Sequence, residues 1–422
     1  MNIFVITPVH PPYVKYLADA YECLCRQSYE RWKWIIVANQ GAIVPASICK
    51  DSRVVVAQAK GSNIGNLKSF GALKCCSDAD VLVEFDADDI LIDDTLAEIA
   101  SAFVDEQIQF VYSNSARFNE KMESPVYSER WGWRYRPFEY HSHELNESVA
   151  WPPSAHSMRR IEWAPNHVRA WRNSAYWKLG GHDVALAVGD DHDLCCRTYI
   201  KYGVEGMRHI DKCLYLYREH GDNTCKLPDV NPMIQKQTDA NYCKYRTEMV
   251  KRWAKDEKLR LVDLGGRFNA WRGFETVDRC GNVDIVCDLN EEWALPDNSV
   301  GVLRASHVFE HLNDPVHAMN EAYRVLAPGG WLLLEVPSTD GRGAFQDPTH
   351  RSWWNQNSIL YYTDRNWAQY IEPEYVGRFQ DSRVVTYFPN EQFKRQDIPV
   401  VQADLIALKP PYDQRPVGEI KI

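Results

Sequence analysis

Three carboxylates directly follow a short apolar run in the N-terminal part of the chain. Residues 81–85 read VLVEF, which is typical of a buried strand, and Asp86, Asp88 and Asp89 come next. Carboxylates crowded at the exit of a buried strand repel one another, so a partner must neutralise them. A divalent cation does this, and a diphosphate can complete its coordination shell. A solvated acidic loop, or a helix N-terminus that attracts acids, explains the same residues equally well.

The surrounding sequence predicts the elements that would position this acidic motif. Apolar strands alternate with helices, and the expected ranges are strands at 2–7, 32–38 and 53–57 and helices at 13–27 and about 61–76. Such alternation indicates a parallel α/β sheet, in which ligands bind outside the carboxyl ends of the strands. Thr7, Asn39 and the acidic motif all fall at such ends. Arg169 and Arg172 would share one face of a helix, if their segment is helical, and could contact a diphosphate or a charged acceptor or simply be solvated.

The motifs ITPVH, WIIVANQG and GSNIGNLKSFGALKCCSDADVLVEFDADD follow one another in an order that resembles inverting family-2 glycosyltransferases of the GT-A fold. Two later motifs, GDDHDL at 189–194 and YREH at 217–220, extend the resemblance over residues 1–225. It implies that Asp88 binds Mn²⁺ or Mg²⁺ on the diphosphate of a nucleotide sugar and that His220 completes the metal site. It also implies that Asp191 is the general base that takes the proton of the attacking acceptor hydroxyl. A lone histidine is otherwise more often structural.

The same resemblance predicts a nucleotide pocket. Its expected members are Thr7, Pro8, Asn39, Asn63 and Asp86, the last of these near the donor ribose. Asn39 stands where the family usually has an aspartate that pairs with the base. The donor base is therefore left open, with a UDP-sugar favoured by family frequency alone.

A second α/β unit is expected after a polar helical connector that ends near residue 256. The predicted elements are strands at 259–264, 274–278, 283–288, 300–306 and 331–336, a helix at 318–326, and an antiparallel pair at 383–388 and 400–408. Only residues 267–273 separate the first two strands beyond the glycine pair. A parallel crossover normally needs a dozen residues or more, so the usual first helix must be missing or reduced to a turn.

This unit, with VDLGG, ETVD, CDLN, ASHVFEHL, YRVLAPGGWLLLEVP and GAFQDPTH in order, resembles short class I methyltransferases that use S-adenosylmethionine. The resemblance implies that Gly265 and Gly266 let the backbone approach the cofactor. It implies that Asp278 accepts hydrogen bonds from the ribose, and that Asp288 and Leu289 flank the adenine.

Methyl transfer to a hydroxyl is helped by a base, and histidines near the expected sulfonium are the candidates. His307 and His311 are the predicted catalytic residues, and Glu310, Asp347 and His350 are further candidates. Each has a structural alternative, since Glu310 and His311 can cap or solvate a helix and Asp347-Pro348 is a turn signal.

Composition narrows the classes of function. The net charge of −10 over 422 residues argues against a broad nucleic-acid interface. No apolar stretch approaches the 18 residues that a membrane span needs. The twelve cysteines, which include the pairs Cys75-Cys76 and Cys195-Cys196, lack paired CxxC spacing and are expected to be reduced in a cytoplasmic protein.

These patterns predict a bifunctional enzyme of two α/β domains. Residues 1–250 form the expected GT-A domain with its helical connector, and residues 251–422 form a Rossmann-like methyltransferase domain. The hypothesis is that one domain adds a sugar with inversion and the other methylates the same glycan. Two alternatives stay open. The second half could be a catalytically inactive module for binding or assembly, and the acceptor could be a protein or a modified nucleic-acid base.

Overall fold

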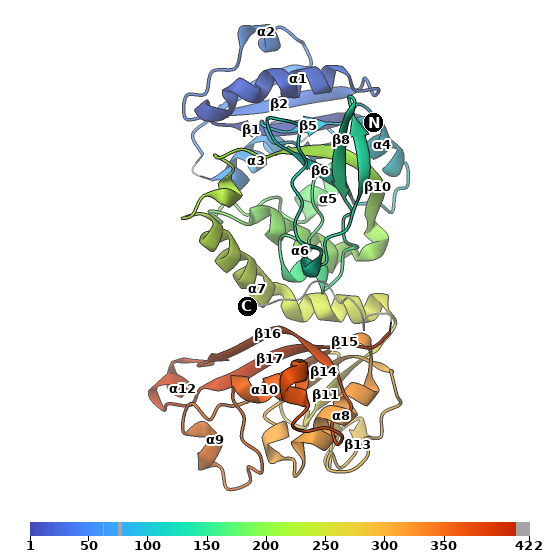
Figure 1. Cartoon of the computed structure of the whole chain (residues 1–422), viewed down its shortest axis with the longest axis vertical. Coiled ribbons are helices and arrows are strands. Elements are labelled where there is room, and N and C mark those ends of the chain that lie inside the picture. Colours follow the sequence, from blue (N-terminus) through green and yellow to red (C-terminus); the bar gives the residue numbers. More distant parts are fainter. Residues whose placement is uncertain (62, 75–77, 411–422) are drawn as a thin grey trace. The chain divides into compact units, whose positions relative to one another are not determined.

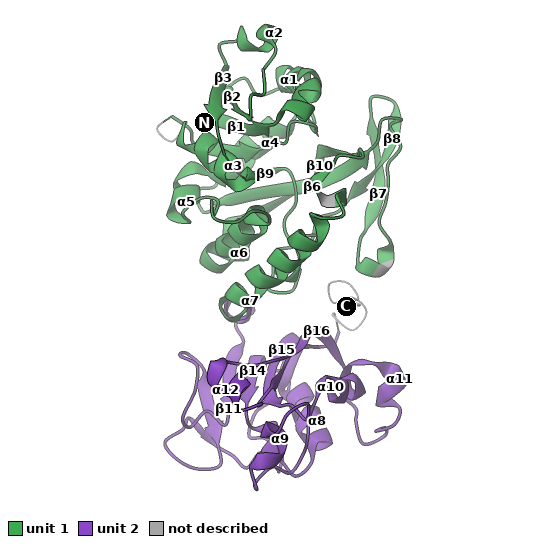
Figure 2. Ribbon diagram, turned by 90° about the vertical axis from the view of Figure 1, so that its left-hand side faces the viewer, with its two compact units in different colours: residues 1–249 green, residues 250–422 purple. Residues whose placement is uncertain are grey.

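The computed structural model describes residues 1–61, 63–74 and 78–410 (Figure 1). The pair Cys75-Cys76 lies outside these ranges, whereas Cys195 and Cys196 are buried free thiols. The chain divides into two compact units, Met1–Met249 and Val250–Ile422 (Figure 2). Both units combine a sheet with helices, which confirms the predicted α/β fold class.

Unit 1 contains a ten-stranded sheet, and its central path has the order β3-β2-β1-β4-β9-β6-β10-β5. The bounds are β1 Ile3–Val9, β2 Trp32–Asn39, β3 Val54–Ala59, β4 Val81–Glu84, β5 Ile90–Leu91, β6 Phe110–Phe118, β7 Tyr135–Tyr140, β8 His143–Ser148, β9 Arg169–Arg172 and β10 Met207–Arg218. The first four strands of the path are parallel, and β9 runs antiparallel to both of its neighbours. The helical alternative for Arg169 and Arg172 is therefore wrong, and three residues apart on a strand they point to opposite faces.

Helices cover this sheet and supply part of the candidate site. Their bounds are η1 Pro11–Tyr16, α1 Leu17–Cys25, α2 Ala46–Cys49, α3 Ile64–Leu73, α4 Thr95–Ala102, α5 Asn173–Lys178, α6 Asp190–Tyr202 and α7 Asn231–Asp256. Gly71 on α3 lets the helix approach the sheet closely, because a Cβ atom there would lie 2.6 Å from Ile6 Cγ2 and 3.0 Å from Val37 Cγ2. The strand order reverses between β1 and β4, which run parallel with Ile6 opposite Glu84. Their carboxyl ends consequently meet at one edge, the usual place for a ligand in such sheets.

Unit 2 contains a seven-stranded sheet in the order β13-β12-β11-β14-β15-β17-β16. The bounds are β11 Arg260–Leu264, β12 Glu275–Asp278, β13 Ile285–Val286, β14 Val300–Ser306, β15 Leu326–Pro337, β16 Phe379–Tyr387 and β17 Val400–Ala407. Its helices are η6 Phe309–His311, α8 Pro315–Val325, α9 Gly343–Gln346, α10 Gln356–Thr363, α11 Arg365–Ala368 and α12 Glu391–Arg395. β16 and β17 pair antiparallel as predicted. Because β17 also pairs with β15, only β16 of these two strands lies at an edge of the sheet.

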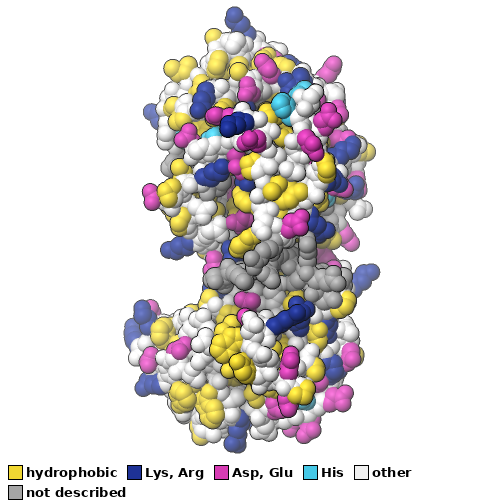
Figure 3. Space-filling view, in the orientation of Figure 1, with side chains coloured by type: hydrophobic (Ala, Val, Ile, Leu, Met, Phe, Trp, Pro, Cys, Tyr) yellow, Lys and Arg dark blue, Asp and Glu magenta, His cyan; other side chains and the backbone are white. Residues whose placement is uncertain are grey.

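The connection between β11 and β12 confirms the predicted loss of the first crossover helix. Residues 265–274, all of them described, form turns without a helix. The strand order of unit 2 reverses between β11 and β14, which again places a ligand-binding edge at two parallel carboxyl ends. On the face seen in Figure 3, Lys and Arg side chains alternate with Asp and Glu side chains over both units. Among the described residues, no helix is both long and apolar enough to cross a membrane.

Candidate active sites

Asp88 and His220 lie together at the edge where β1 and β4 end. The Asp88 Oδ2 and His220 Nε2 atoms are 2.9 Å apart. The imidazole stacks on the Tyr16 ring at 5.3 Å between centroids, and Arg218 donates from Nε to the Asp88 main-chain oxygen at 2.6 Å. One carboxylate oxygen and one imidazole nitrogen form a donor set that suits Mn²⁺. The N–H of Asp222 points at His220 Nδ1 at 3.2 Å, so the proton lies on Nε2 and a cation bound there would displace it.

The three acids of the motif have different environments. Asp89 is 1% exposed, accepts from the Tyr215 hydroxyl at 2.7 Å and from Arg218 N at 2.7 Å, and thereby ties the loop to β10. Burial, reinforced by the neighbouring carboxylates, raises its pKa well above the usual range. Partial burial, together with the charges of Asp88 and Glu84, raises the pKa of Asp86 to about 6, and its side chain stays one-third exposed. Asp89 is therefore engaged by the protein itself, whereas the side chains of Asp86 and Asp88 stay partly exposed.

Glu84, the last residue of β4, is the centre of a buried ion cluster. Its carboxylate lies 3.2 Å from Lys68 Nζ, 3.0 Å from Arg169 Nε and 2.7 Å from His182 Nε2. Burial by itself would raise the pKa of Glu84, but its three basic partners outweigh that effect and lower it well below the usual range. The cluster joins α3, β9 and the loop before α6 to the end of β4.

Asp191 is held beside this cluster by the same arginine. Arg169 Nη2 lies 2.9 Å from Asp191 Oδ2 and 3.2 Å from His167 Nε2, and that imidazole nitrogen lies 3.7 Å from Asp86 Oδ2. Burial opposes ionisation of Asp191, but the charges of Arg169 and Lys68 outweigh it and lower its pKa to about 2. Arg169 therefore links the predicted base, Asp191, to the imidazole that lies beside the predicted donor-side acid, Asp86.

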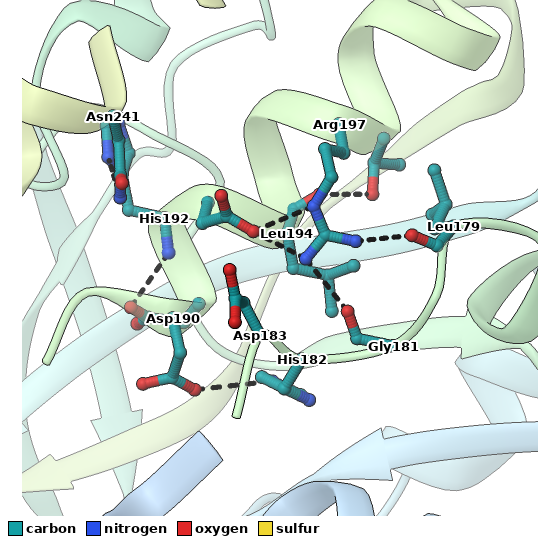
Figure 4. A network of polar contacts seen from close by, with 12 residues as sticks. Leu179, Gly181, His182, Asp183, Asp190, His192, Leu194, Arg197 and Asn241 are labelled. Carbon is teal, nitrogen blue, oxygen red and sulfur yellow. Dashed lines mark hydrogen bonds and ion pairs between the residues drawn. The ribbon is translucent and has the colours of Figure 1, made fainter. Parts of the chain in front are cut away.

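The start of α6 fixes where Asp191 points. Gly189 precedes the helix with φ +70°, a conformation that favours glycine, and Asn241 donates to its carbonyl at 2.9 Å. Figure 4 shows Asp190 directed at His182, with 3.7 Å between Oδ2 and Nε2, and Arg197 reaching the carbonyls of the turn at 179–181. Helix α6 is thus anchored on both sides of its first turn.

The residues predicted for the nucleotide pocket are largely engaged by the protein itself. The Thr7 hydroxyl is fully buried and accepts from Trp34 Nε1 at 2.8 Å, and Pro8 is also buried in β1. Asn39 accepts from Gly61 N at 3.1 Å and donates to Gly61 O at 3.2 Å, a double role that an aspartate could not fill. Asn63 caps α3 by accepting from Asn66 N at 2.8 Å. Contacts from Thr7 and Pro8 to a nucleotide would have to come from the backbone.

The glycine pair of unit 2 is required by packing. Gly265 has φ +67°, and a Cβ atom there would overlap the Val308 side chain that follows β14. At Gly266 a Cβ would lie 2.9 Å from the Asp263 carbonyl. Asp263 is fully buried. Its carboxylate accepts hydrogen bonds from Arg304 Nη1 at 2.9 and 2.8 Å and from Trp271 N at 2.9 Å, and these bonds hold the turn in place. The glycines thus bring the ends of β11 and β14 together at the switch point.

The other predicted cofactor residues surround this edge. Asp278 ends β12, and its carboxylate accepts a long hydrogen bond, 3.4 Å, from Cys280 N. Asp288 is exposed and accepts from Asn290 N at 3.0 Å, which lowers its pKa. The Leu289 side chain is 7% exposed and packs in the core. Only main-chain atoms of Leu289 could therefore flank an adenine.

His307 and His311 both follow β14. His307 Nδ1 lies 3.3 Å from Glu310 Oε1, and that carboxylate raises the pKa of His307. His311 Nδ1 lies 3.0 Å from Thr349 Oγ1. The side chain of His307 is 40% exposed, and the Glu310 carboxylate lies behind it.

Comparisons with known proteins assign the two regions. Residues 4–165 match the model of glycosyl transferase family 2, and residues 244–334 match that of a methyltransferase domain. The N-terminal region is thus similar to family 2 glycosyltransferases, and the C-terminal region is similar to methyltransferase domains. The two matches support transferase chemistry of both kinds.

The individual proteins that resemble this chain either match only a short part of it or share little sequence identity with it. A protein of Mycolicibacterium smegmatis (strain ATCC 700084 / mc(2)155), named "Probable S-adenosylmethionine-dependent methyltransferase", is 38% identical over 76 residues, which are 17% of this chain and 30% of that protein. The chain therefore spans less than a third of that relative. The crystal structure of S. aureus TarS 1-349 in complex with UDP is 13% identical with a TM-score of 0.41 and covers 60% of this chain and 70% of that one. S. aureus TarS itself is 14% identical with a TM-score of 0.40, over 60% and 44% of the two chains.

Sequence reasoning missed the residues that hold the predicted groups in place. These are Glu84, Lys68 and His182 around Arg169 in unit 1, and Asp263 with Arg304 in unit 2. A detectable signal existed for two of them, because an acid within an apolar strand run needs a buried counter-charge. Glu84 in VLVEF and Asp263 in LVDL are such acids.

Proposed function

We propose that unit 1 transfers a sugar with inversion from a nucleotide sugar, with a UDP-sugar favoured, to an acceptor hydroxyl. Asp88 and His220 would hold Mn²⁺ or Mg²⁺, which supplies the charge that a leaving diphosphate needs. Asp86 would contact the donor ribose. Asp191 would accept the proton of the attacking hydroxyl. The observation that carries this proposal is the pair Asp88–His220 at the switch point, with Asp191 anchored on Arg169 beside it.

The electrostatics of Asp191 keep it ionised but make it a weak base. A base must be ionised before the acceptor arrives, and the lowered pKa keeps this carboxylate charged at any working pH. Its ion pair with Arg169 weakens it as a base, and an acceptor hydroxyl would have to compete for the same oxygens. The gain is a fixed position on a helix whose first turn is anchored, which favours the reactive geometry.

We propose further that unit 2 transfers a methyl group from S-adenosylmethionine to a hydroxyl of the same glycan. Asp278 would accept from the cofactor ribose, and the main chain at Gly265 and Gly266 would lie along the cofactor. His307, oriented by Glu310, would take the hydroxyl proton. Two units in one chain motivate the common acceptor. Methyl groups found only on a molecule that receives no sugar would refute it.

The test of sugar transfer compares two carboxylate variants. Asp88→Ala is expected to abolish Mn²⁺-dependent binding of UDP-, GDP- or dTDP-sugars, as measured by calorimetry. Asp191→Asn is expected to leave donor binding intact and to slow transfer by about 10²- to 10⁴-fold, the usual range for a lost general base. Asp105→Asn, which changes an exposed acid paired with Arg208, is the matched control. Equal loss of donor affinity in Asp88→Ala and Asp191→Asn would refute the assignment of the base.

A further inference from the structure

A second group of potential metal ligands lies in unit 2, apart from the Asp88–His220 pair. Glu310, His311 and His350 each place one donor atom within 4.8 Å of the others. The first two belong to η6, directly after β14, and the third follows α9. The main chain joins the two segments, because Arg351 N and Ser352 N donate to Glu310 O at 2.7 and 3.1 Å. These hydrogen bonds therefore hold together the two segments that carry the three potential ligands.

Glu310 provides an independent indication that something binds there. Its residue is 2% exposed, and neither carboxylate oxygen has a hydrogen-bond partner among the described residues. Oε1 has an ion-pair contact with His307 Nδ1 at 3.3 Å, whereas no ion pair or hydrogen bond is found for Oε2 in the described part of the chain. A buried carboxylate oxygen without a partner is costly, and a cation would remove that cost.

The hydrogen bonds around the two histidines select the tautomer that a metal needs. His350 Nδ1 lies 2.8 Å from the Ala344 carbonyl, which can only accept, so Nδ1 carries the proton. The Thr349 hydroxyl donates to Asp347 Oδ1 at 2.7 Å, so its oxygen accepts from His311 Nδ1 at 3.0 Å. Both rings therefore keep the lone pair on Nε2. Imidazoles whose other nitrogen donates to a carbonyl, or through a hydroxyl to a carboxylate, are typical of metal ligands.

We propose that Glu310, His311 and His350 bind a divalent transition-metal ion. Two imidazole nitrogens and one carboxylate oxygen suit Zn²⁺, Co²⁺ or Fe²⁺, whereas a set in which imidazoles outnumber carboxylates disfavours Mg²⁺ and Ca²⁺. Three protein ligands leave positions open for a substrate. The site lies beside the predicted methyl donor, since Val308 contacts Gly265. If the proposed methyl transfer holds, an acceptor hydroxyl bound to the ion would lose its proton more easily.

The test measures metal binding alone and does not depend on methyl transfer. The tag-free full-length chain carrying His220→Ala, which removes the candidate ligand in unit 1, is titrated with Co²⁺. We expect one ion per chain with visible absorption bands, competed by Zn²⁺ but not by millimolar Mg²⁺. Adding Glu310→Gln or His350→Ala should lower the affinity by about 100-fold or more, given that loss of an outer-shell partner costs about 10- to 100-fold.

Two further variants keep the test specific. His317→Ala changes a histidine of α8 that bonds to the Glu291 carbonyl, and it should leave Co²⁺ affinity unchanged. Thr349→Val removes the acceptor of His311 and should weaken binding by about tenfold. Thermal unfolding of each variant without metal checks that it folds. The proposal is wrong if no ion binds, if Mg²⁺ displaces Co²⁺, or if His317→Ala and Glu310→Gln reduce affinity equally.

Discussion

Lys68 in unit 1 and Lys409 in unit 2 are both shielded from water, Lys68 more than Lys409, but they contact different groups. Lys68 is 4% exposed and lies 3.2 Å from the Glu84 carboxylate, and the charge of Glu84 outweighs burial and raises its pKa. Lys409 is half-buried and donates to the carbonyls of Leu326 and Arg324 at 2.8 and 3.1 Å and to an amide oxygen. Burial lowers its pKa to about 8.

Glu84 in unit 1 and Glu310 in unit 2 are buried acids that also differ in their partners. Glu84 has three basic partners within 3.2 Å, whereas Glu310 has one ion-pair contact, at 3.3 Å to His307. In unit 1 the charge of Glu84 is therefore balanced by the protein's own side chains, and Arg169 pairs with both Glu84 and Asp191. In unit 2 the balance around Glu310 is incomplete, and this is why a ligand of opposite charge is expected there.

The largest predicted effect comes from breaking the balanced cluster. Glu84→Gln would leave Lys68 and Arg169 buried without their shared carboxylate. Removing one member of a buried ion pair costs about 3–5 kcal/mol, and we expect a loss of this size in the stability of unit 1. Hydrogen exchange of β1 and β4 peptides, read against peptides of β15 and β17, measures it unit by unit.

The control for this variant is an exposed ion pair in the same unit. Glu98→Gln removes the partner of Lys212 on the surface, 2.6 Å away, and should cost no more than about 1 kcal/mol. Similar exchange rates for Glu84→Gln and Glu98→Gln would show that the cluster does not stabilise unit 1.

Much of the fold could be predicted because apolar runs, and the residues that end them, are local features of the sequence. The runs at β1, β2 and β4 indicate buried strands, and the seven residues 267–273 leave too little chain for a helix. The segment at Arg169–Arg172 could not be assigned in this way. It is a strand because β4 and β6 pair with it on either side, and these contacts come from residues more than fifty positions away.

The candidate sites likewise contain residues that the local sequence indicates and residues that only the tertiary structure reveals. Asp86 and Asp88 are visible in the sequence because they end a strand, but Glu84 looks like a member of that strand. Its partners come from α3, β9 and the loop at His182, so only the tertiary fold reveals the cluster. In unit 2 no sequence pattern pairs Glu310 with His350, and it is the main-chain hydrogen bonds from Arg351 and Ser352 to Glu310 that bring the two together.

A smaller effect is expected from Asp278→Ala, which tests whether the two sites work independently. Loss of a hydrogen-bonding carboxylate at the ribose should weaken S-adenosylmethionine binding by about 1.5–3 kcal/mol, or roughly 10- to 150-fold. Calorimetry with S-adenosylmethionine measures it, and sugar transfer by the same variant should be unchanged. Asp284→Ala, an exposed acid in the same region that bonds to Thr276, is the control. Impaired sugar transfer in Asp278→Ala alone would show that the units are coupled.

The smallest predicted effect is the pH dependence that Lys409 gives to unit 2. A lysine has a pKa of about 10.4 in an unfolded chain, and the folded value is lowered to about 8. Between these values the unfolded chain binds more protons, so this contribution to stability rises with pH from about 8 and levels off above about 10.4. Because the side chain is only half-buried, solvent screening should keep the gain below about 1 kcal/mol. Lys409→Met lacks this titration.

Urea unfolding of the parent and of Lys409→Met at pH 7 and pH 9.5 measures the effect as a difference, in which all other titrations cancel. We expect the parent to gain stability relative to the variant at the higher pH. Lys68 provides the opposite case, since its raised pKa stabilises the folded state while the unfolded lysine is protonated, and that contribution is lost only as pH rises through the folded value. A parent that loses stability relative to Lys409→Met at pH 9.5 would mean that the charge of the nearby Asp297 outweighs burial at Lys409, and it would remove the contrast between the two lysines.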